Sequence, residues 1–89
     1  MKIDIYDSYA TSRSGQTLHF DVLVESGTLA EQALTYGRQW LSQQGEAVDS
    51  LQQNRCQFCH SEAARPDVAA QIQQHGFYIL PLDGCPPAV

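Results

Sequence analysis

Charged side chains are scarce in this 89-residue chain, and cationic ones are the scarcest. Lysine and arginine together number 5 against 10 aspartates and glutamates, which gives a formal net charge of −5, and eleven glutamines take much of the place of charged residues. Proteins that bind nucleic acid neutralise phosphates with Lys and Arg. The composition therefore argues against a nucleic-acid partner.

Long hydrophobic runs are also missing. The longest, residues 77–80, is far shorter than the roughly 18 apolar residues that indicate a membrane span. The chain starts Met-Lys-Ile-Asp, and an acid at position 4 is not typical of the apolar region of a signal peptide. We therefore expect a cytoplasmic protein without a membrane partner.

The common enzyme signatures are absent as well. The chain has no G-x-S-x-G elbow, no P-loop and no dinucleotide-binding fingerprint. At 9.9 kDa it is also too small for two domains with a cleft between them. We predict one domain over residues 1–85 with a short tail at 86–89, and we assign no catalytic residue.

Alternating apolar residues predict two strands at the start of the chain. Ile3, Ile5 and Tyr9 share one side of residues 3–9, and a cleaner alternation runs through residues 17–25. A polar turn between them favours an antiparallel hairpin.

The rest of the chain predicts a helix, a weak strand, a second helix and a last strand. Thr28 and Glu31 have the spacing of a capping box, and the helix that follows should end before Gly45. A weak strand is expected over 49–55, and the second helix should open near Pro66 and stop at Gly76.

Residues 77–80 are apolar at every position, which suits a central strand. The resulting fold class is α+β: a two-layer sandwich in which a small mixed sheet carries both helices on one face, in the order strand, strand, helix, strand, helix, strand.

One face of this sheet should remain free of helices. With Ile3 and Ile5 turned inward, the side chains expected on the free face are Asp4, Tyr6, His19, Asp21 and Glu25. Such a face could bind a cation or a protein partner, although an antiparallel sheet commonly leaves one side to water.

The three cysteines carry the most concentrated chemistry. Cys56 and Cys59 form a C-x-x-C, the spacing with which two thiolates bind one zinc ion. Cys85, just beyond the last strand, is the expected third ligand, and His60 or His75 the fourth. The predicted metal site is therefore Cys56, Cys59, Cys85 and His60, with zinc as the cofactor.

Three other interpretations of the cysteines stay open. The C-x-x-C could be a thiol–disulfide redox pair, the run C-x-x-C-H matches a haem attachment motif literally, and the cysteines could simply fill the core. A redox pair usually has a helix N-terminus beside it, and Pro66 stands seven residues after Cys59.

Several short motifs occur in a fixed order along nearly the whole chain. They are Ile5-Tyr6-Asp7-Ser8-Tyr9, His19-Phe20-Asp21-Val22, Gln39-Trp40-Leu41, Cys56-Gln57-Phe58-Cys59-His60-Ser61, Gly76-Phe77-Tyr78-Ile79 and Gly84-Cys85. Together they resemble a family of small, mostly bacterial proteins catalogued as domain-of-unknown-function family two thousand twenty-four. The resemblance implies a compact α+β domain of this size and carries over no catalytic or binding residue.

The leading hypothesis is a small cytosolic zinc-binding module whose ion joins the segment before the second helix to the C-terminus. The alternatives are a non-enzymatic interaction domain with inert cysteines, which would bind a protein partner through the free sheet face, and a thiol–disulfide redox protein. A monomer or a homodimer is compatible with each.

Overall fold

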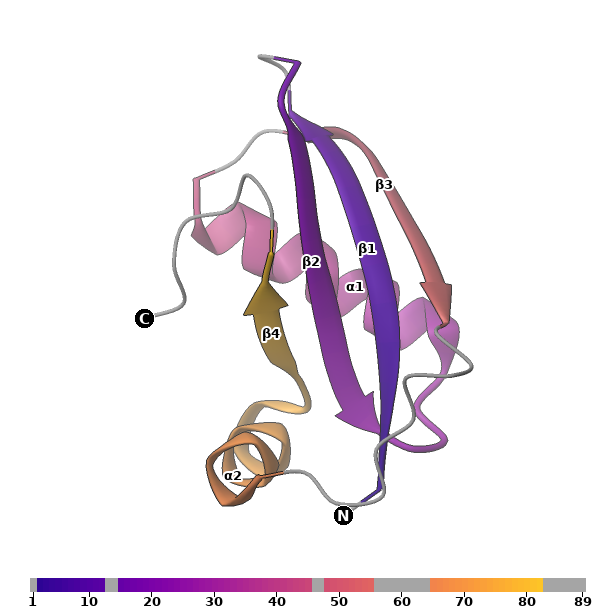
Figure 1. The fold of residues 1–89 in the computed structure, drawn as a ribbon, viewed down its shortest axis with the longest axis vertical. Coiled ribbons are helices and arrows are strands. Elements are labelled where there is room, and N and C mark those ends of the chain that lie inside the picture. Colours follow the sequence, from indigo (N-terminus) through magenta and orange to yellow (C-terminus); the bar gives the residue numbers. More distant parts are fainter. Residues whose placement is uncertain (1, 13–14, 46–47, 56–64, 83–89) are drawn as a thin grey trace.

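The computed structural model describes residues 2–12, 15–45, 48–55 and 65–82, and it confirms the predicted α+β class and the order of elements (Figure 1). The elements are β1 (Ile3–Ser12), β2 (Thr17–Glu25), α1 (Ala30–Gln43), β3 (Val48–Arg55), α2 (Pro66–His75) and β4 (Tyr78–Pro81).

The four strands form one sheet in the order β3-β1-β2-β4. All three pairings are antiparallel, so the prediction of a mixed sheet is wrong. The β1–β2 hairpin lies in the middle, with β3 paired to β1 on one side and β4 paired to β2 on the other, so neighbouring strands alternate in direction across the whole sheet. The prediction that residues 77–80 form a central strand is also wrong, since β4 is an edge strand.

The clean alternation of β2 determines the main core. Its even-numbered residues turn toward α1, and Phe20 is fully buried with its ring centroid 4.9 Å from that of Trp40. Ala33 and Leu41 of α1 complete the contact. One face of the sheet, here called the inner face, is therefore covered by α1 and consists of the even-numbered residues of β1 and β2.

The register of the hairpin corrects the predicted sides of β1. Tyr6 pairs with Val22, so Tyr6 and Asp4 lie on the inner face and are buried, not exposed as predicted. Asp4 tolerates burial because its carboxylate accepts hydrogen bonds from the Ser26 hydroxyl and the Gly27 N–H, each at 3.2 Å. Period-two reasoning failed here because β1 has apolar residues on both sides.

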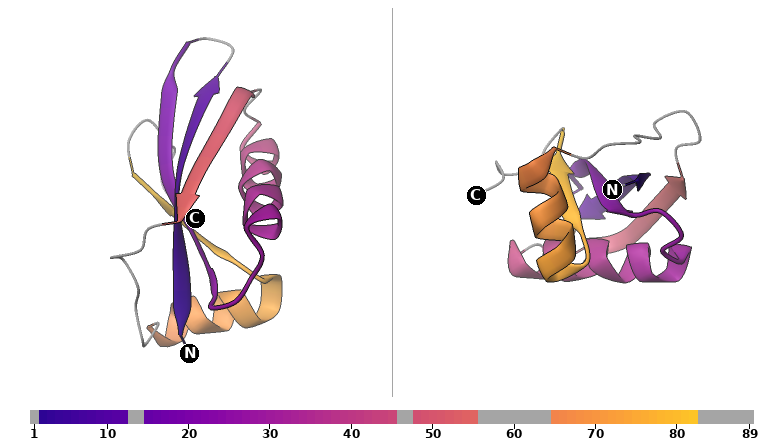
Figure 2. Two further views of the ribbon diagram at one scale, coloured as in Figure 1. Left: turned by 90° about the vertical axis from the view of Figure 1, so that its right-hand side faces the viewer. Right: turned by 90° about the horizontal axis from the view of Figure 1, so that it is seen from below.

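The two helices do not share one face of the sheet, contrary to the prediction. Val68 and Ile72 of α2 pack against Ile3 and Leu23, which belong to the opposite face, here called the outer face and formed by the odd-numbered residues of β1 and β2. Figure 2 shows α1 along one side of the sheet and α2 across its end. An apolar patch on the outer face is the reason, since it needs a helix to cover it.

The helix ends agree with the predicted stops but not with the predicted cap. Gly45 and Gly76 take positive φ values of 77° and 91° just after their helices. The N-cap of α1 is Leu29 without a side-chain hydrogen bond, because the Thr28 hydroxyl donates to the Glu25 carbonyl oxygen at 2.7 Å instead. Among the described residues, no helix combines the length and apolar character that crossing a membrane requires.

Substitution of Gly76 tests how closely the end of α2 packs against Tyr36 of α1. A Cβ atom at this position would collide with the Tyr36 hydroxyl, whereas one at Gly45 would meet open space, and both residues have positive φ. We expect Gly45→Ala to lower the free energy of unfolding by about 1–2 kcal/mol, from backbone strain alone. Gly76→Ala should cost about 1–3 kcal/mol more, because Tyr36 must move. Urea denaturation of both variants measures the difference, and equal losses would contradict this packing.

Candidate functional site

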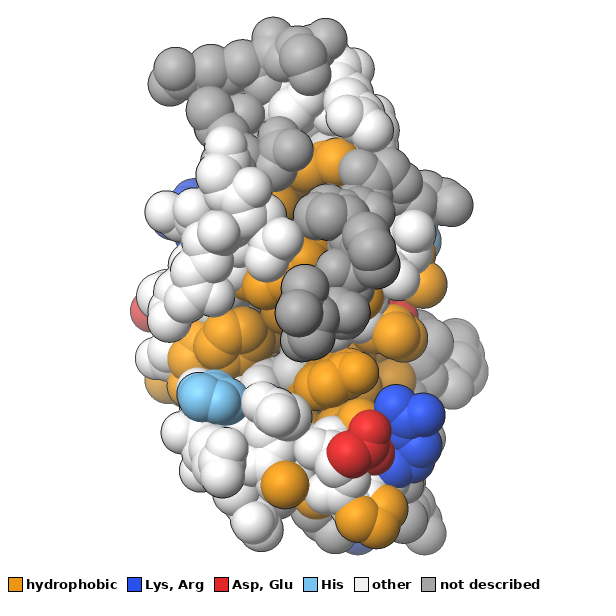
Figure 3. Space-filling view, turned by 90° about the vertical axis from the view of Figure 1, so that its left-hand side faces the viewer, with side chains coloured by type: hydrophobic (Ala, Val, Ile, Leu, Met, Phe, Trp, Pro, Cys, Tyr) orange, Lys and Arg blue, Asp and Glu red, His pale blue; other side chains and the backbone are white. Residues whose placement is uncertain are grey.

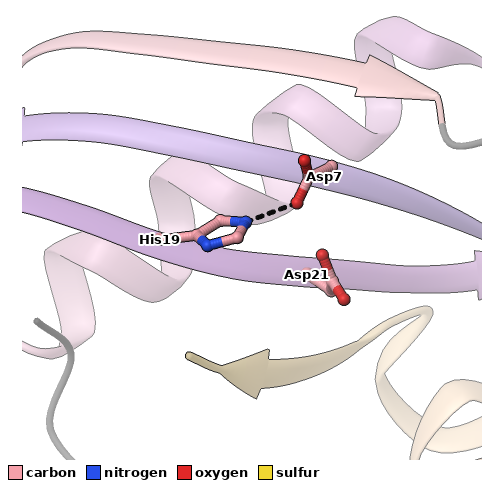
Figure 4. Close-up of side chains that lie close together, drawn as sticks. All are labelled: Asp7, His19 and Asp21. Carbon is pink, nitrogen blue, oxygen red and sulfur yellow. Dashed lines mark hydrogen bonds and ion pairs between the residues drawn. The ribbon is translucent and has the colours of Figure 1, made fainter. Parts of the chain in front are cut away.

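Three side chains that can bind a cation meet on the outer face of the sheet (Figure 4). They are Asp7 of β1 and His19 and Asp21 of β2, here called the Asp–His cluster. One potential ligand atom from each lies within 4.8 Å of the others, and all three residues are half-buried. The cluster thus brings two carboxylates and an imidazole together on neighbouring strands.

The register of the hairpin places these residues side by side. Asp7 is directly opposite Asp21, and Tyr9 is directly opposite His19. Side chains at opposed positions of an antiparallel pair have Cβ atoms about 4.5–5.5 Å apart, and diagonal neighbours remain within reach of long side chains. Regular strand geometry is therefore sufficient to assemble the cluster without any loop.

The imidazole of His19 is oriented from two sides by β1. Its Nε2 lies 2.5 Å from Oδ1 of Asp7, at hydrogen-bond distance. Its ring also stacks on that of Tyr9, with 4.3 Å between the centroids and 6° between the planes. The stack and the hydrogen bond together restrict the rotation of the ring and direct Nε2 toward the carboxylates.

The two carboxyl groups have opposite pKa shifts. Burial, a hydrogen bond with Asp7 and the charge of Asp7 raise the pKa of Asp21 to about 6, which the charge of His19 only partly offsets. Partial burial alone would raise the pKa of Asp7, but its hydrogen bonds with His19, Asp21 and Tyr9 and the charge of His19 lower it below the ordinary value. Below about pH 6 the pair thus favours a state in which Asp21 keeps a proton and Asp7 is ionised.

The donor set of the Asp–His cluster is two oxygens and one nitrogen. Carboxylate and imidazole ligands together suit divalent ions of intermediate softness, such as Zn²⁺. Two atoms that each lie about 2.1 Å from one ion are at most about 4.2 Å apart. The ligand atoms of the cluster lie within 4.8 Å of one another, so at most a small inward rotation of a side chain would be needed for binding.

The predicted metal ligands Cys56, Cys59, His60 and Cys85 all lie outside the described residues. The alternative fourth ligand, His75, is exposed in the last turn of α2. The structure therefore leaves the cysteine site as a prediction.

Sequence reasoning found two members of the cluster and missed the third. His19 and Asp21 lie on the helix-free part of the outer face, as expected. Asp7 was not predicted to lie on the free face. Its position was nevertheless unusual, because it interrupts the apolar side of β1 between Ile5 and Tyr9. A charged residue at a position where the alternation predicts an apolar one indicates that no helix covers this part of the sheet face.

The raised pKa of Asp21 predicts how stability depends on pH. Between about pH 4 and pH 6 the folded protein keeps a proton on Asp21 that the unfolded chain releases, so the contribution of this group to stability falls as the pH rises through that window. Asp21→Asn removes the ionisation. We expect this variant to be more stable than the native protein at pH 7 and to lose its advantage toward pH 4. Urea denaturation across that range measures it, and a variant less stable at pH 7 would show that the ionised carboxylate is not destabilising.

Comparison with known proteins agrees with this fold and leaves the activity open. The NMR structure of protein NE1680 from Nitrosomonas europaea, a structural genomics target, is similar to this chain with a TM-score of 0.79 and 32% sequence identity, over 97% of this chain and 100% of that one. No curated protein matches. The model of the family described as domain of unknown function (DUF2024) matches residues 1–82, and the chain therefore belongs to this family.

Proposed function

We propose that this protein is a small metal-binding domain and that the Asp–His cluster binds a divalent transition-metal ion. The observation that supports this most strongly is the convergence of three ligand atoms within 4.8 Å on the outer face. The site uses Asp7, His19 and Asp21, and it requires no residue from a loop.

Electrostatics favours a cation at this position. Asp7 and Asp21 are directly opposed, and like charges in opposed positions destabilise a sheet. Burial, together with the hydrogen bond and the charge of Asp7, raises the pKa of Asp21 to about 6, so without an ion Asp21 takes up a proton more readily than an ordinary aspartate does. A divalent ion would neutralise both carboxylates at once, so its binding would release that proton and remove the repulsion.

The site would leave part of the coordination sphere open. Three protein ligands do not complete a tetrahedral shell, and the ligand side chains are only half-buried. Water or a ligand atom from a partner would fill the remaining positions. Such an ion exchanges with solvent more readily than an ion enclosed by four protein ligands, so we assign the cluster a binding role and not a structural one.

Titration with Zn²⁺ tests this function. We expect the native protein to bind one equivalent in isothermal titration calorimetry, and His19→Gln and Asp21→Asn to weaken the affinity by about tenfold or more, because each removes a ligand. Asp67→Asn is a matched control, since it makes the same chemical change as Asp21→Asn at an exposed position of α2. If this control weakens binding as much as the cluster variants do, the Asp–His cluster is not the site.

A zinc site formed by Cys56, Cys59, Cys85 and His60 is the second candidate. The C-x-x-C spacing supports it. A metal ion that connects two distant segments also stabilises a short chain more than a large one. The two sites use different donors, since the cluster offers only oxygen and nitrogen and the cysteines offer sulfur.

Substitution with Co²⁺ distinguishes the two candidates by their ligands. Binding at the Asp–His cluster predicts weak visible absorption without a thiolate-to-metal charge-transfer band in the near ultraviolet, and the spectrum should persist in a Cys56→Ser, Cys59→Ser double variant. Binding at the cysteines predicts that band and its loss in the double variant. If neither His19→Gln nor the double variant changes the uptake of Co²⁺, both proposals fail.

The outer face also has the character of a contact surface for a protein. Tyr9, Leu80 and Leu82 are 41%, 41% and 44% exposed. The register puts Leu80 opposite Asp21, and the Leu82 N–H donates to the His19 carbonyl oxygen at 2.9 Å. Apolar side chains thus flank the polar cluster. If the outer face serves only to bind a protein partner and the cysteines are inert, the native protein should bind neither Zn²⁺ nor Co²⁺.

A further inference from the structure

A groove of about 490 Å³ lies between the end of α1, the end of α2 and the edge strand β4. The volume lies within the range of small-molecule sites, about 300–1,000 Å³. Figure 3 views the molecule from the side of β4 and α2, where hydrophobic side chains are visible between polar ones. The groove is separate from the Asp–His cluster, none of whose residues lines it.

The lining of the groove is polar but carries no acidic side chain, lysine or arginine among the described residues. Its polar groups are the carboxamides of Gln39, Gln43, Gln44 and Gln71 and the imidazole of His75. A carboxamide oxygen accepts hydrogen bonds and has two lone pairs for them. These groups can therefore surround a ligand with acceptors without adding a formal charge.

Aromatic side chains and Ile79 supply the apolar part of the groove. Trp40 and Phe77 contribute to it, and Phe77 is fixed by stacking on Tyr36, with 4.6 Å between the ring centroids. The faces of aromatic rings carry negative potential and attract organic cations. Such walls suit a ligand that is both flat and positively charged.

Both helices end at the groove, and each helix end favours a positive charge there. The last turn of α1, up to Gln43, and the last turn of α2, up to His75, each contribute lining residues. A helix C-terminus carries a partial negative charge and carbonyl groups without helical partners. The last turn of α1 contains no basic residue to offset this charge, whereas the last turn of α2 contains His75, and the net charge of the chain is −5.

We propose that the groove binds a small organic cation of the guanidinium class. The planar cation would lie against the aromatic walls, donate its N–H groups to the glutamine carboxamide oxygens and the terminal helix carbonyls, and place its charge between the two helix ends. This site does not depend on metal binding at the outer face.

Methylguanidinium and methylurea form a matched pair of probes, because they have nearly the same shape and differ in charge. The experiment follows the Trp40 indole N–H and the glutamine side-chain amides of the ¹⁵N-labelled full chain by NMR at about pH 8, where histidine is generally neutral. We expect saturable shifts at the groove with methylguanidinium and an affinity about tenfold weaker for methylurea. Equal affinities, or shifts that do not saturate, would overturn the proposal.

Charge substitutions at the groove test the electrostatic argument independently. Gln43→Glu and Gln71→Glu each add a negative charge at the groove and should strengthen methylguanidinium binding by threefold or more. Gln32→Glu adds the same charge in the first turn of α1, away from the groove, and should leave the affinity unchanged. An equal gain in Gln32→Glu would show that only net charge matters, and that result would refute a defined site.

A third probe distinguishes an arginine side chain of a partner protein from a free small molecule as the occupant of the groove. N-acetyl-arginine amide presents the same head group as an arginine within a polypeptide does. Binding at least as tight as that of methylguanidinium indicates an arginine side chain of a partner as the occupant, and weaker binding indicates a free small molecule. Absence of saturable binding by both cations would refute the site.

Discussion

Cross-strand register in the β1–β2 hairpin is the constraint on which the other features of this protein depend. Ile3 faces Glu25 at one end and Thr11 faces Thr17 at the other. A shift of β2 by one residue would turn Phe20 and its even-numbered neighbours away from α1 and expose the main core. The same shift would separate Asp7 from Asp21. Burial of the inner face therefore holds the polar residues of the outer face in place.

The chain has few charged side chains, and the outer face and the groove differ in how they present negative groups. On the outer face, Asp7 and Asp21 concentrate formal charge at one position, where burial and the neighbouring Asp7 raise the pKa of Asp21. The groove between the helices is lined by two helix ends and by glutamine carboxamides, with no ionised carboxylate among its described residues. The abundance of glutamine thus has a structural counterpart, since these neutral acceptors gather where both helices end.

The sequence indicated the elements well and their arrangement less well. Clean alternation in β2, Pro66 at the start of α2 and glycines after both helices are local signals, and all were correct. The side of β1 that faces α1 was not encoded locally, because Ile3 and Tyr6 are both apolar and only pairing with β2 decides between them. Because of the same ambiguity, Asp7 was not predicted to belong to the cluster, and both helices were predicted on one face of the sheet. The cysteine site could be predicted only from spacing, and its residues lie outside the described part of the chain.

The Asp–His cluster has a further property that follows from its position on paired strands. Its three residues occupy fixed places on a two-stranded ribbon, with Asp7 and Asp21 opposed and His19 two residues before Asp21 on the same side of β2. Backbone hydrogen bonds of the ladder, not a folded loop, set the spacing between them. Any antiparallel hairpin with one covered face can present the same three side chains at the same places. The spacing of the three side chains is thus a property of the two-stranded ribbon, and the packing of α1 against the inner face keeps that ribbon in register.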